Sequence, residues 1–307
     1  MSPVRPIFFI VGPTGVGKTG IAAEVAARCN GEIIGADAFQ VYTGLDILTA
    51  KPSKELRRQI PHHLVDIIPP AQSFDVAQYL ERAGRTVQEI SNRSRLPFVA
   101  GGTGLYVKAL THGLSELPKT NPELRAKLEN CSLEALKERI QILDPDCAAQ
   151  IDLKNARRLI RAIEVCELTG KPFSSFRNQW NKPHELVSGV FLTRDRNDLY
   201  ARIDQRVLEM MRNGLLDEVR ALSDCGPTAG QAIGLREARD CLAGMISPDE
   251  CIAKIQQGTR NYAKRQITWF KRESAFEPVN LSEFHDPEQA VQLIVEKANA
   301  FRECFHL

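Results

Sequence analysis

The stretch Gly12-Pro13-Thr14-Gly15-Val16-Gly17-Lys18-Thr19 decides the fold, because it reads G-x-x-x-x-G-K-T, a complete phosphate-binding loop. An apolar run at residues 7–11 precedes the loop and predicts a buried strand, and a helical pattern follows it. In this context backbone N–H groups and the helix N-terminus surround an anion. Lys18 then neutralises the anion, and the Thr19 hydroxyl ligates Mg²⁺. The loop predicts a phosphorylated ligand with Mg²⁺ as cofactor, but it leaves the identity of that ligand open.

The sequence around the loop alternates between strand and helix patterns. Apolar runs predict strands at residues 32–36, 63–68 and 97–100, and helical periodicity predicts a helix at residues 74–91. Strands that alternate with helices pair in parallel, so we expect an α/β fold with a P-loop NTPase-like parallel sheet core. Ligands of such sheets lie beyond the carboxyl ends of the strands. The loop, Asp37 and residues 101–104 all project from that edge.

Near residues 117–118 the pattern changes to helices alone. From about 121 to 176 each predicted element is a helix, and a strand-like run at 187–192 then resumes the core pattern. We therefore divide the chain into a P-loop α/β core with C-terminal helices, residues 1–117 and 187–307, and an inserted all-helical domain, residues 118–186. Further helices are predicted at residues 198–213, 215–224, 231–243, 248–273 and 287–304.

Composition limits the class of protein. The 307 residues carry a net charge of only +2, which does not by itself indicate a nucleic-acid partner. No apolar run approaches the length of a membrane span, and the N-terminus lacks a signal-peptide pattern. The eight cysteines include no C-x-x-C pair, which argues against a zinc knuckle and a disulfide framework. We therefore expect a cytoplasmic protein with reduced thiols.

Polar residues follow the second predicted strand. Asp37 occupies a place where P-loop enzymes often carry a metal-binding or basic carboxylate, although ordinary turn caps also occur there. The stretch that it opens, residues 37–52, mixes carboxylate, amide, aromatic and Lys side chains, which is rich for a plain connector. His62 and His63 are neighbours on a predicted strand and so point to opposite faces. We interpret these two histidines as structural or substrate-edge residues rather than metal ligands.

An ordered set of motifs along the whole chain resembles the bacterial tRNA dimethylallyltransferases. The matching blocks are residues 12–19, 37–52, 61–66, 73–79, 101–106, 155–165 and 259–270. No single block is decisive, but their order is highly specific. The resemblance implies transfer of a dimethylallyl group from dimethylallyl diphosphate to N6 of the adenosine on the 3′ side of the anticodon (tRNA position 37). The products are N6-isopentenyladenosine and diphosphate.

The resemblance also implies a role for each part of the site. The loop holds the diphosphate leaving group, whose neutralisation is the main electrostatic task because the allylic carbon becomes cationic. Asp37 accepts the adenine N–H and removes its proton, with Lys18 and Thr103 as the other catalytic residues. The implied diphosphate-binding residues are Gly12, Pro13, Thr14, Gly15, Val16, Gly17, Lys18, Thr19 and Arg206, with Thr19 as the Mg²⁺ ligand.

The implied partner is the anticodon stem-loop of tRNA, with the target adenine flipped out of its stack. The resemblance implies tRNA contacts at Asp37, Ala38, Phe39, Gln40, Thr103, Arg125, Arg157, Arg158, Leu159, Ile160 and Arg161. A second basic face is predicted on the last long helix, where Arg260, Lys264 and Lys271 adjoin an apolar stripe. We interpret Trp269 and Phe270 as packing residues. We expect a monomer with no membrane attachment and no protein partner.

Some positions depart from the family pattern. Ala38 stands where Ser is usual and Leu235 where Tyr is usual, but Asp37, Lys18, Thr19 and Thr103 are all present. Three other functions remain open at this stage. They are prenyl transfer to free AMP, ADP or ATP by an adenylate isopentenyltransferase, phosphoryl transfer by a P-loop small-molecule kinase, and RNA binding with an inactive loop.

Overall fold

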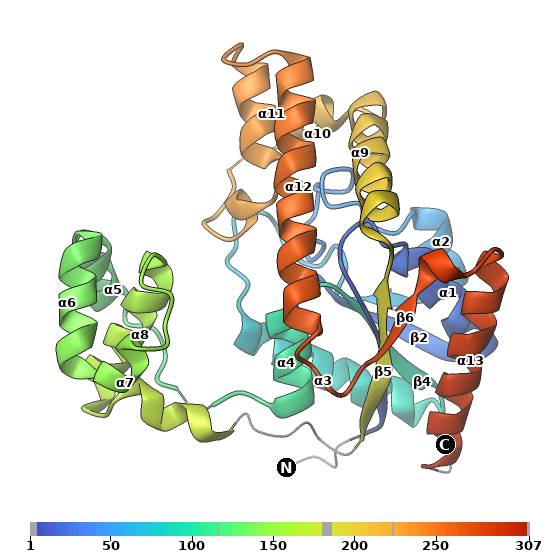
Figure 1. The fold of residues 1–307 in the computed structure, drawn as a ribbon, viewed down its shortest axis with the longest axis horizontal. Coiled ribbons are helices and arrows are strands. Elements are labelled where there is room, and N and C mark those ends of the chain that lie inside the picture. Colours follow the sequence, from blue (N-terminus) through green and yellow to red (C-terminus); the bar gives the residue numbers. More distant parts are fainter. Residues whose placement is uncertain (1–4, 116, 180–185, 223, 306–307) are drawn as a thin grey trace. The chain divides into compact units, whose positions relative to one another are not determined.

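The computed structural model describes residues 5–115, 117–179, 186–222 and 224–305 (Figure 1). The chain divides into two compact units. The first comprises Met1–Thr111 and His184–Leu307, and the second comprises His112–Pro183. Each boundary lies a few residues before the one expected at 118 or 186. The helical segment is thus an insertion between two parts of an α/β unit.

A sheet of six parallel strands forms the centre of the first unit, in the order β3-β2-β4-β1-β5-β6. The strands are β1 (Ile7–Val11), β2 (Gly31–Ala36), β3 (His62–His63), β4 (Leu96–Gly101), β5 (Val187–Thr193) and β6 (Glu277–Asn280). Every residue of β1 is buried, as expected for an inner strand of a parallel sheet covered on both faces. The expected α/β fold with a parallel sheet is confirmed.

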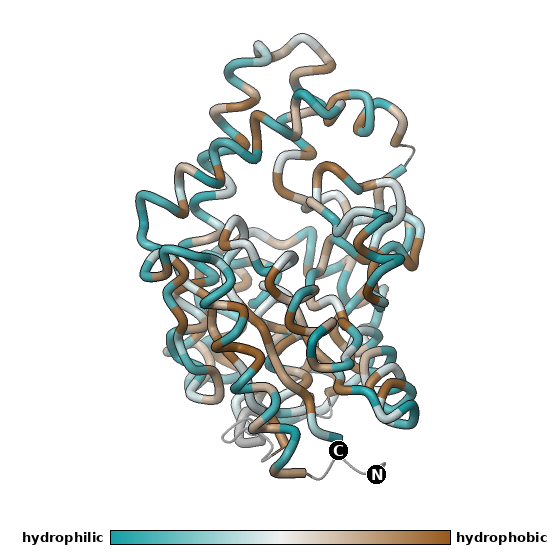
Figure 2. Tube along the Cα trace, turned by 90° about the vertical axis from the view of Figure 1, so that its right-hand side faces the viewer, coloured by the Kyte–Doolittle hydropathy of each residue, from teal (hydrophilic) through white to brown (hydrophobic). Residues whose placement is uncertain are grey.

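Helices cover both faces of the sheet because successive strand residues point in opposite directions. Phe8 and Ile10 pack with helices α1 (Lys18–Arg28) and α13 (Pro287–Glu303). Phe9 and Val11 pack on the other face, with helices α3 (Val76–Asn92) and α4 (Gly104–His112). The inner strands β1 and β4 are largely hydrophobic, and brown segments lie through the middle of the tube in Figure 2. The sheet therefore separates two apolar cores.

Further helices of the first unit extend beyond the sheet (Figure 1). They are α2 (Lys54–Gln59), α9 (Arg196–Arg212), α10 (Leu215–Ala221), α11 (Leu235–Leu242) and α12 (Pro248–Phe270). Helix α12 is long enough to pack against α9 and α11 and also to reach the sheet, where Phe270 is buried. Ile267, one turn earlier, packs against both apolar cores. This helix therefore passes directly beside the carboxyl ends of the strands.

The second unit has its own core. Its helices are α5 (Pro122–Glu129), α6 (Leu133–Leu143), α7 (Pro145–Ala148) and α8 (Ala156–Thr169), followed by the 3₁₀ segment Phe173–Gln179. Leu136, Ile140 and Ile163 are at most 1% exposed and form the centre of this core. Among the described residues of the whole chain, no helix combines the length and apolar character that a membrane span requires.

Several elements differ from the sequence expectations, and three of these differences have a local cause. The strand expected at 63–68 is limited to His62–His63, because Leu64 and Asp66 adopt φ of +59° and +64° and leave the extended conformation. The helix expected at 231–243 begins only at Leu235, after Gly234 with φ of +92°. Strand β6 was not expected. Its Pro278 is unfavourable in a strand interior but is tolerated here because β6 lies at the edge of the sheet.

Candidate functional site

The loop between β1 and α1 has the conformation that its glycines predict. Gly15 and Gly17 have φ of +83° and +104°, which side chains other than glycine rarely adopt. A Cβ atom on Gly15 would also lie 2.6 Å from Cγ1 of Ile203. Helix α1 begins at Lys18, so its N-terminus follows the loop directly. The local sequence therefore builds a concave anion site at the edge of the sheet.

Three arginines support this loop from α9 and the turn before it. Arg194 Nε donates to the Val16 carbonyl oxygen at 2.9 Å, and Arg202 Nε donates to that of Gly15 at 3.2 Å. Arg206 Nη2 donates to Thr14 Oγ1 at 2.7 Å, while its buried Nε has no hydrogen-bond partner among the described groups. Arg206 was expected at the site. Arg194 and Arg202 were missed, although the spacing of four residues between 202 and 206 places both on one face of a helix.

Lys18 lies among these cationic groups. Its Nζ donates to the Pro13 carbonyl oxygen at 2.7 Å across the loop. Burial lowers the pKa of Lys18 to about 7; Asp37 opposes this change, and Arg206 adds to it. Burial also lowers the pKa of Arg206. Burial and mutual repulsion therefore disfavour the charged forms of Lys18 and Arg206, and a bound anion would favour them.

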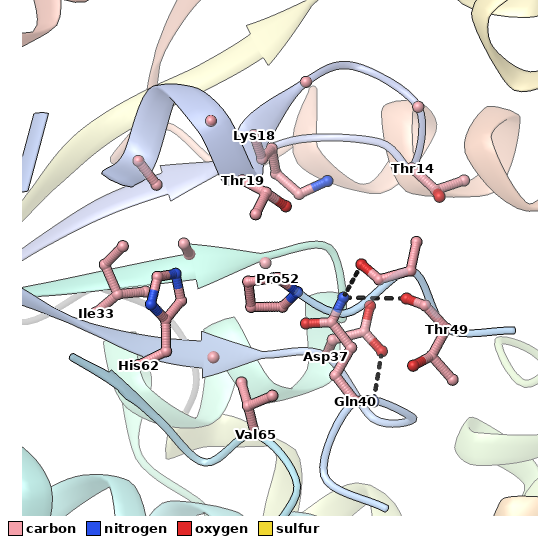
Figure 3. Close-up of a pocket in the computed structure, with 18 of the residues that line it drawn as sticks. Thr14, Lys18, Thr19, Ile33, Asp37, Gln40, Thr49, Pro52, His62 and Val65 are labelled. Atoms are coloured by element: carbon pink, nitrogen blue, oxygen red, sulfur yellow. Dashed lines mark hydrogen bonds between the residues drawn. The ribbon is translucent and has the colours of Figure 1, made fainter. Parts of the chain in front are cut away.

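A pocket of about 200 Å³ opens beside the loop. Figure 3 shows Thr14, Lys18 and Thr19 along one side of it, with Asp37, Gln40 and Thr49 on the opposite side. Arg202, Arg206, Gln266 and His62 add further polar groups. The apolar part of the lining comes from Ala22, Ile33, Pro52, Val65 and Ala100. The pocket therefore offers charged groups to a phosphate and apolar contacts to a small hydrocarbon.

The end of β2 and the end of β4 meet at Asp37. Asp37 Oδ1 accepts hydrogen bonds from the N–H groups of Phe39 and Gln40 at 2.9 and 3.3 Å. Thr103 Oγ1 accepts from the Ala38 N–H at 3.0 Å. The sequence predicted that Asp37 and Thr103 lie close together. In the fold, Thr103 contacts Ala38, the residue that follows Asp37. Asp37 lines the larger pocket on the side opposite the phosphate-binding loop (Figure 3).

A second, smaller pocket of about 50 Å³ adjoins the first. The two share Thr14, Asp37, Thr49 and Arg206 in their linings. The rest of the smaller lining is mostly apolar and aromatic, from Phe39, Leu48, Met210, Ala232, Ile233, Ile255, Thr259 and Tyr262. Asp37 and Arg206 therefore stand where a phosphorylated ligand in one pocket would approach a flat ligand in the other.

Residues 37–52 are held in place by contacts that the sequence did not predict. Glu218 of α10 accepts hydrogen bonds from the N–H groups of residues 46, 47 and 48 at 2.7–2.9 Å. Gln40 Nε2 donates to the carbonyl oxygens of Thr49 and Ala50, both at 3.1 Å. Lys51, with its side chain 1% exposed, pairs with Asp46 and Asp66. The side-chain N–H groups of Gln40 therefore stabilise the 37–52 segment itself.

Two residues of α12, the buried Gln266 and the partly buried Tyr262, complete the site and were not singled out from the sequence. Gln266 hydrogen-bonds both the phosphate-binding loop and the loop after β4, and Tyr262 lines the smaller pocket. Burial raises the pKa of Tyr262, and the nearby Thr103 hydroxyl partly opposes this change. Both residues lie in the 259–270 motif block, which could have indicated them from the sequence. The apolar residues Ala263 and Phe270 of this block are buried as expected.

The adjacent histidines have separate roles. His62 lines the larger pocket, and burial lowers its pKa. His63 Nε2 lies 2.6 Å from Glu32 Oε2, and Glu32 also pairs with Arg93 and Arg95. One histidine therefore borders the pocket, and the other belongs to an ion-pair cluster at the sheet edge.

The donor groups around the loop fit Mg²⁺ of the kind found with phosphates. Such an ion keeps several waters and takes few protein ligands, because phosphate oxygens supply the rest. The Thr19 hydroxyl and the Asp37 carboxylate line the same pocket and are hard oxygen donors. Within the described ranges no group of three or more His, Cys, Asp or Glu residues could hold a metal by protein ligands alone.

The arginines predicted for tRNA belong to the second unit and differ in their surroundings. Arg157 and Arg158 are exposed at the start of α8. Arg161 instead pairs with the fully buried Glu164 at 2.7 Å and donates to the Pro118 carbonyl oxygen. Arg125 pairs with Glu129 at 3.2 Å. Leu159 and Ile160 are buried in the core of this unit, so their side chains support α8 from inside. Contact of these residues with tRNA stays a prediction.

The basic face of α12 is partly paired. Arg260 forms an ion pair with Asp204 of α9 at 2.5 Å, whereas Lys264 and Lys271 are exposed. Trp269 packs edge-to-face on Phe270, and a Cβ atom on Gly104 would lie 2.5 Å from its Cδ2. The interpretation of Trp269 and Phe270 as packing residues is confirmed.

Comparison with known proteins gives a consistent result. The model of one protein family, IPP transferase, matches residues 40–273. A tRNA dimethylallyltransferase of Akkermansia muciniphila is 40% identical over 289 residues, which cover 94% of this chain and 98% of the relative. A full-length tRNA isopentenylpyrophosphate transferase of Bacillus halodurans is 36% identical, with a TM-score of 0.71 over 99% of this chain and 100% of that chain. A eukaryotic dimethylallyltransferase acting on tRNA shares the fold, with a TM-score of 0.80 at 24% identity over 94% of this chain and 78% of that chain.

Proposed function

Because this chain belongs to the IPP transferase family, we propose that it transfers a dimethylallyl group from dimethylallyl diphosphate to N6 of the adenosine on the 3′ side of the anticodon. At the level of reaction class, the chain is a tRNA prenyltransferase. The names of the relatives disfavour both transfer to a free adenine nucleotide and phosphoryl transfer to a small molecule. The observation that carries the finer proposal is the junction of two pockets at Asp37 and Arg206.

The larger pocket suits the donor. Its phosphate-binding loop, Lys18 and Arg206 provide positive charge for a diphosphate, and Ile33, Val65 and neighbouring apolar residues suit a five-carbon chain. When C1 of the dimethylallyl group separates from the diphosphate oxygen, the bonding electrons leave with the diphosphate. Lys18 and Arg206 stabilise that developing charge. Mg²⁺, when bound at Thr19, supplies additional neutralisation of the phosphate oxygens.

The smaller pocket suits the acceptor. Its apolar and aromatic lining matches a flipped adenine, which has to leave the anticodon stack to reach a site of this kind. N6 of adenine is a weak nucleophile because its lone pair is delocalised into the ring. As N6 forms its bond to C1, Asp37 accepts one N6 proton, which it later releases to water. The Phe39 and Gln40 N–H groups hold the carboxylate in position for this transfer.

Binding of tRNA needs basic surface outside the pockets. The exposed Arg157 and Arg158 on the second unit, and Lys264 and Lys271 on α12, are suited to phosphate contacts. Such contacts position an RNA without reading its sequence. The proposal requires neither a protein partner nor a second copy of the chain.

The proposal is tested by transfer of radiolabelled dimethylallyl diphosphate, with Mg²⁺, to three acceptors in parallel. The acceptors are an unmodified tRNA transcript with adenosine next to the anticodon, the same transcript with guanosine at that position, and AMP. Label on the first acceptor alone is expected. Guanosine is the matched control because it lacks the N6 amine.

Other outcomes have clear meanings. Label on AMP alone would place the chain with enzymes of free nucleotides. Equal label on both transcripts would exclude the adenosine next to the anticodon as the acceptor. Absence of label from all three, with ATP consumed in the presence of a small-molecule acceptor, would return the kinase alternative.

A further inference from the structure

Gln266 lies between the two loops that carry the reaction groups. Its side chain projects from α12 and is 5% exposed. The Thr14 N–H donates to Gln266 Oε1 at 2.9 Å, and Gln266 Nε2 donates to the Gly102 carbonyl oxygen at 2.9 Å. Thr14 belongs to the phosphate-binding loop, and Gly102 immediately precedes Thr103. The Gln266 amide therefore joins the loop of the diphosphate site to the loop that carries Thr103.

The surroundings leave little freedom at this junction. A Cβ atom on Gly102 would lie 2.2 Å from Gln266 Nε2, so the side chain rests directly on the glycine backbone. Tyr262, one turn earlier on α12, has its hydroxyl group close to both Gln266 and Thr103. The position of α12 is itself set by the burial of Ala263 and Phe270 in the two apolar cores. A rigid helix thus holds both loops.

The chemistry of the bridge is specific. One loop presents an N–H donor and the other presents a carbonyl acceptor, so the bridging group needs one acceptor and one donor at the end of the same side chain. A glutamine amide has both. An ionised carboxylate has no donor and would face the Gly102 carbonyl oxygen with like charge, whereas a protonated carboxyl has the acceptor and the donor in similar places.

We propose that Gln266 is a positioning residue, which sets the spacing between the phosphate-binding loop and the loop of Thr103 and thereby aligns the donor carbon with the adenine amine. This inference rests on the proposed prenyl transfer. The amide oxygen and nitrogen of Gln266 both bond to the loops, so Gln266 acts on the substrates only through Thr14 and Gly102. Misplacement of reacting groups by about 1 Å lowers rates on the order of 100-fold, which is the size of effect expected here.

The test compares Gln266→Met, which has similar length and no amide, with Gln266→Glu, which has the same shape. Transfer to tRNA is measured between pH 6 and pH 9, and kcat of each variant is divided by kcat of the wild type at the same pH. Lys18, Asp37 and Arg206 line the same pocket, and Tyr262 contacts Gln266. Because all four remain in every protein, their own titrations largely cancel in this ratio.

For Gln266→Met we expect a ratio of about 0.01 at every pH, with KM for both substrates within about threefold of wild type. For Gln266→Glu we expect a similarly low ratio at pH 9, which rises at least tenfold toward pH 6 as the buried carboxyl takes up a proton. A residue that only stabilised the fold would show no such recovery at low pH. A Met variant with more than half of the wild-type kcat, or a Glu ratio that does not rise on acidification, would overturn the proposal.

A second measurement separates this inference from the proposed function. Hydrogen exchange of the Thr14 amide is followed in the wild type and in Gln266→Met, with the unfolding temperature of each recorded. We expect exchange about 5- to 30-fold faster in the variant, because the lost hydrogen bond corresponds to about 1–2 kcal/mol. Wild-type protein that transfers no label would refute prenyl transfer alone. Equal exchange rates at Thr14 would refute the bridge itself.

Discussion

Binding of diphosphate is expected to draw a proton onto Lys18. In the free protein the pKa of Lys18 is about 7, lowered chiefly by burial, with Asp37 opposing and Arg206 lowering it further. At pH 8 only about one tenth of the Lys18 side chains are then charged. The negative charge of a bound diphosphate favours the ammonium form and raises the pKa of Lys18. Binding therefore takes up about 0.9 proton at pH 8, about 0.5 at pH 7 and about 0.1 at pH 6.

The direction of the pH dependence follows from these values. Since the free protein has the lower pKa, raising the pH above 7 stabilises the free form relative to the complex. The apparent affinity for diphosphate falls by up to about tenfold per pH unit until the pKa of the complex is reached. Below pH 6 Lys18 is charged in both states, and this dependence disappears.

The assay is isothermal titration calorimetry of inorganic diphosphate at fixed Mg²⁺, in two buffers that differ in ionisation enthalpy. Diphosphate itself exchanges protons, so the matched control is Lys18→Arg, whose guanidinium stays charged throughout this range. The difference in proton uptake between wild type and control is expected to be about 0.9 at pH 8 and about 0.5 at pH 7. No difference at either pH would show that Lys18 is already charged in the free protein and would refute the reasoning.

Four further substitutions separate catalysis from stability. Asp37→Asn keeps an oxygen for the turn but loses the base, so we expect the single-turnover transfer rate to fall about 100- to 10,000-fold, with filter-bound tRNA unchanged; a loss below tenfold would remove Asp37 from proton transfer. Glu218→Gln weakens three hydrogen bonds to the 46–48 backbone and should lower the calorimetric midpoint by about 2–4 °C, whereas an unchanged midpoint would contradict that anchoring role. Arg161→Ala leaves Glu164 buried without its partner and should cost about 3–5 kcal/mol in denaturant unfolding of the helical unit. Arg158 is exposed, so Arg158→Ala should leave unfolding unchanged and weaken tRNA binding. Loss of stability in Arg158→Ala and loss of tRNA binding alone in Arg161→Ala would contradict both assignments.

The sequence was sufficient wherever a function depends on contiguous residues. The order of strand, glycine-rich loop and helix requires no distant contact, because the φ angles of Gly15 and Gly17 and the start of α1 at Lys18 are local properties. Parallel pairing also followed from the alternation of strands and helices, and it brought Asp37 and Thr103 to one edge. The expected strand at 63–68 was wrong because two left-handed residues turn the chain toward residues 40–41, which no apolar pattern records.

Tertiary packing was needed for contacts between residues far apart in the chain. Gln266 reaches Thr14 across 252 positions, and Glu218 reaches the 46–48 backbone across about 170. Neither side chain has a local pattern that predicts its partner, because a hydrogen bond depends on distance and direction in space. The same limit applies to the arginines of α8, where spacing placed 157 and 161 together but burial of Glu164 gave Arg161 a structural partner. Local patterns thus determined which chemistry the chain carries, while packing of α9, α10 and α12 against the loops determined its geometry.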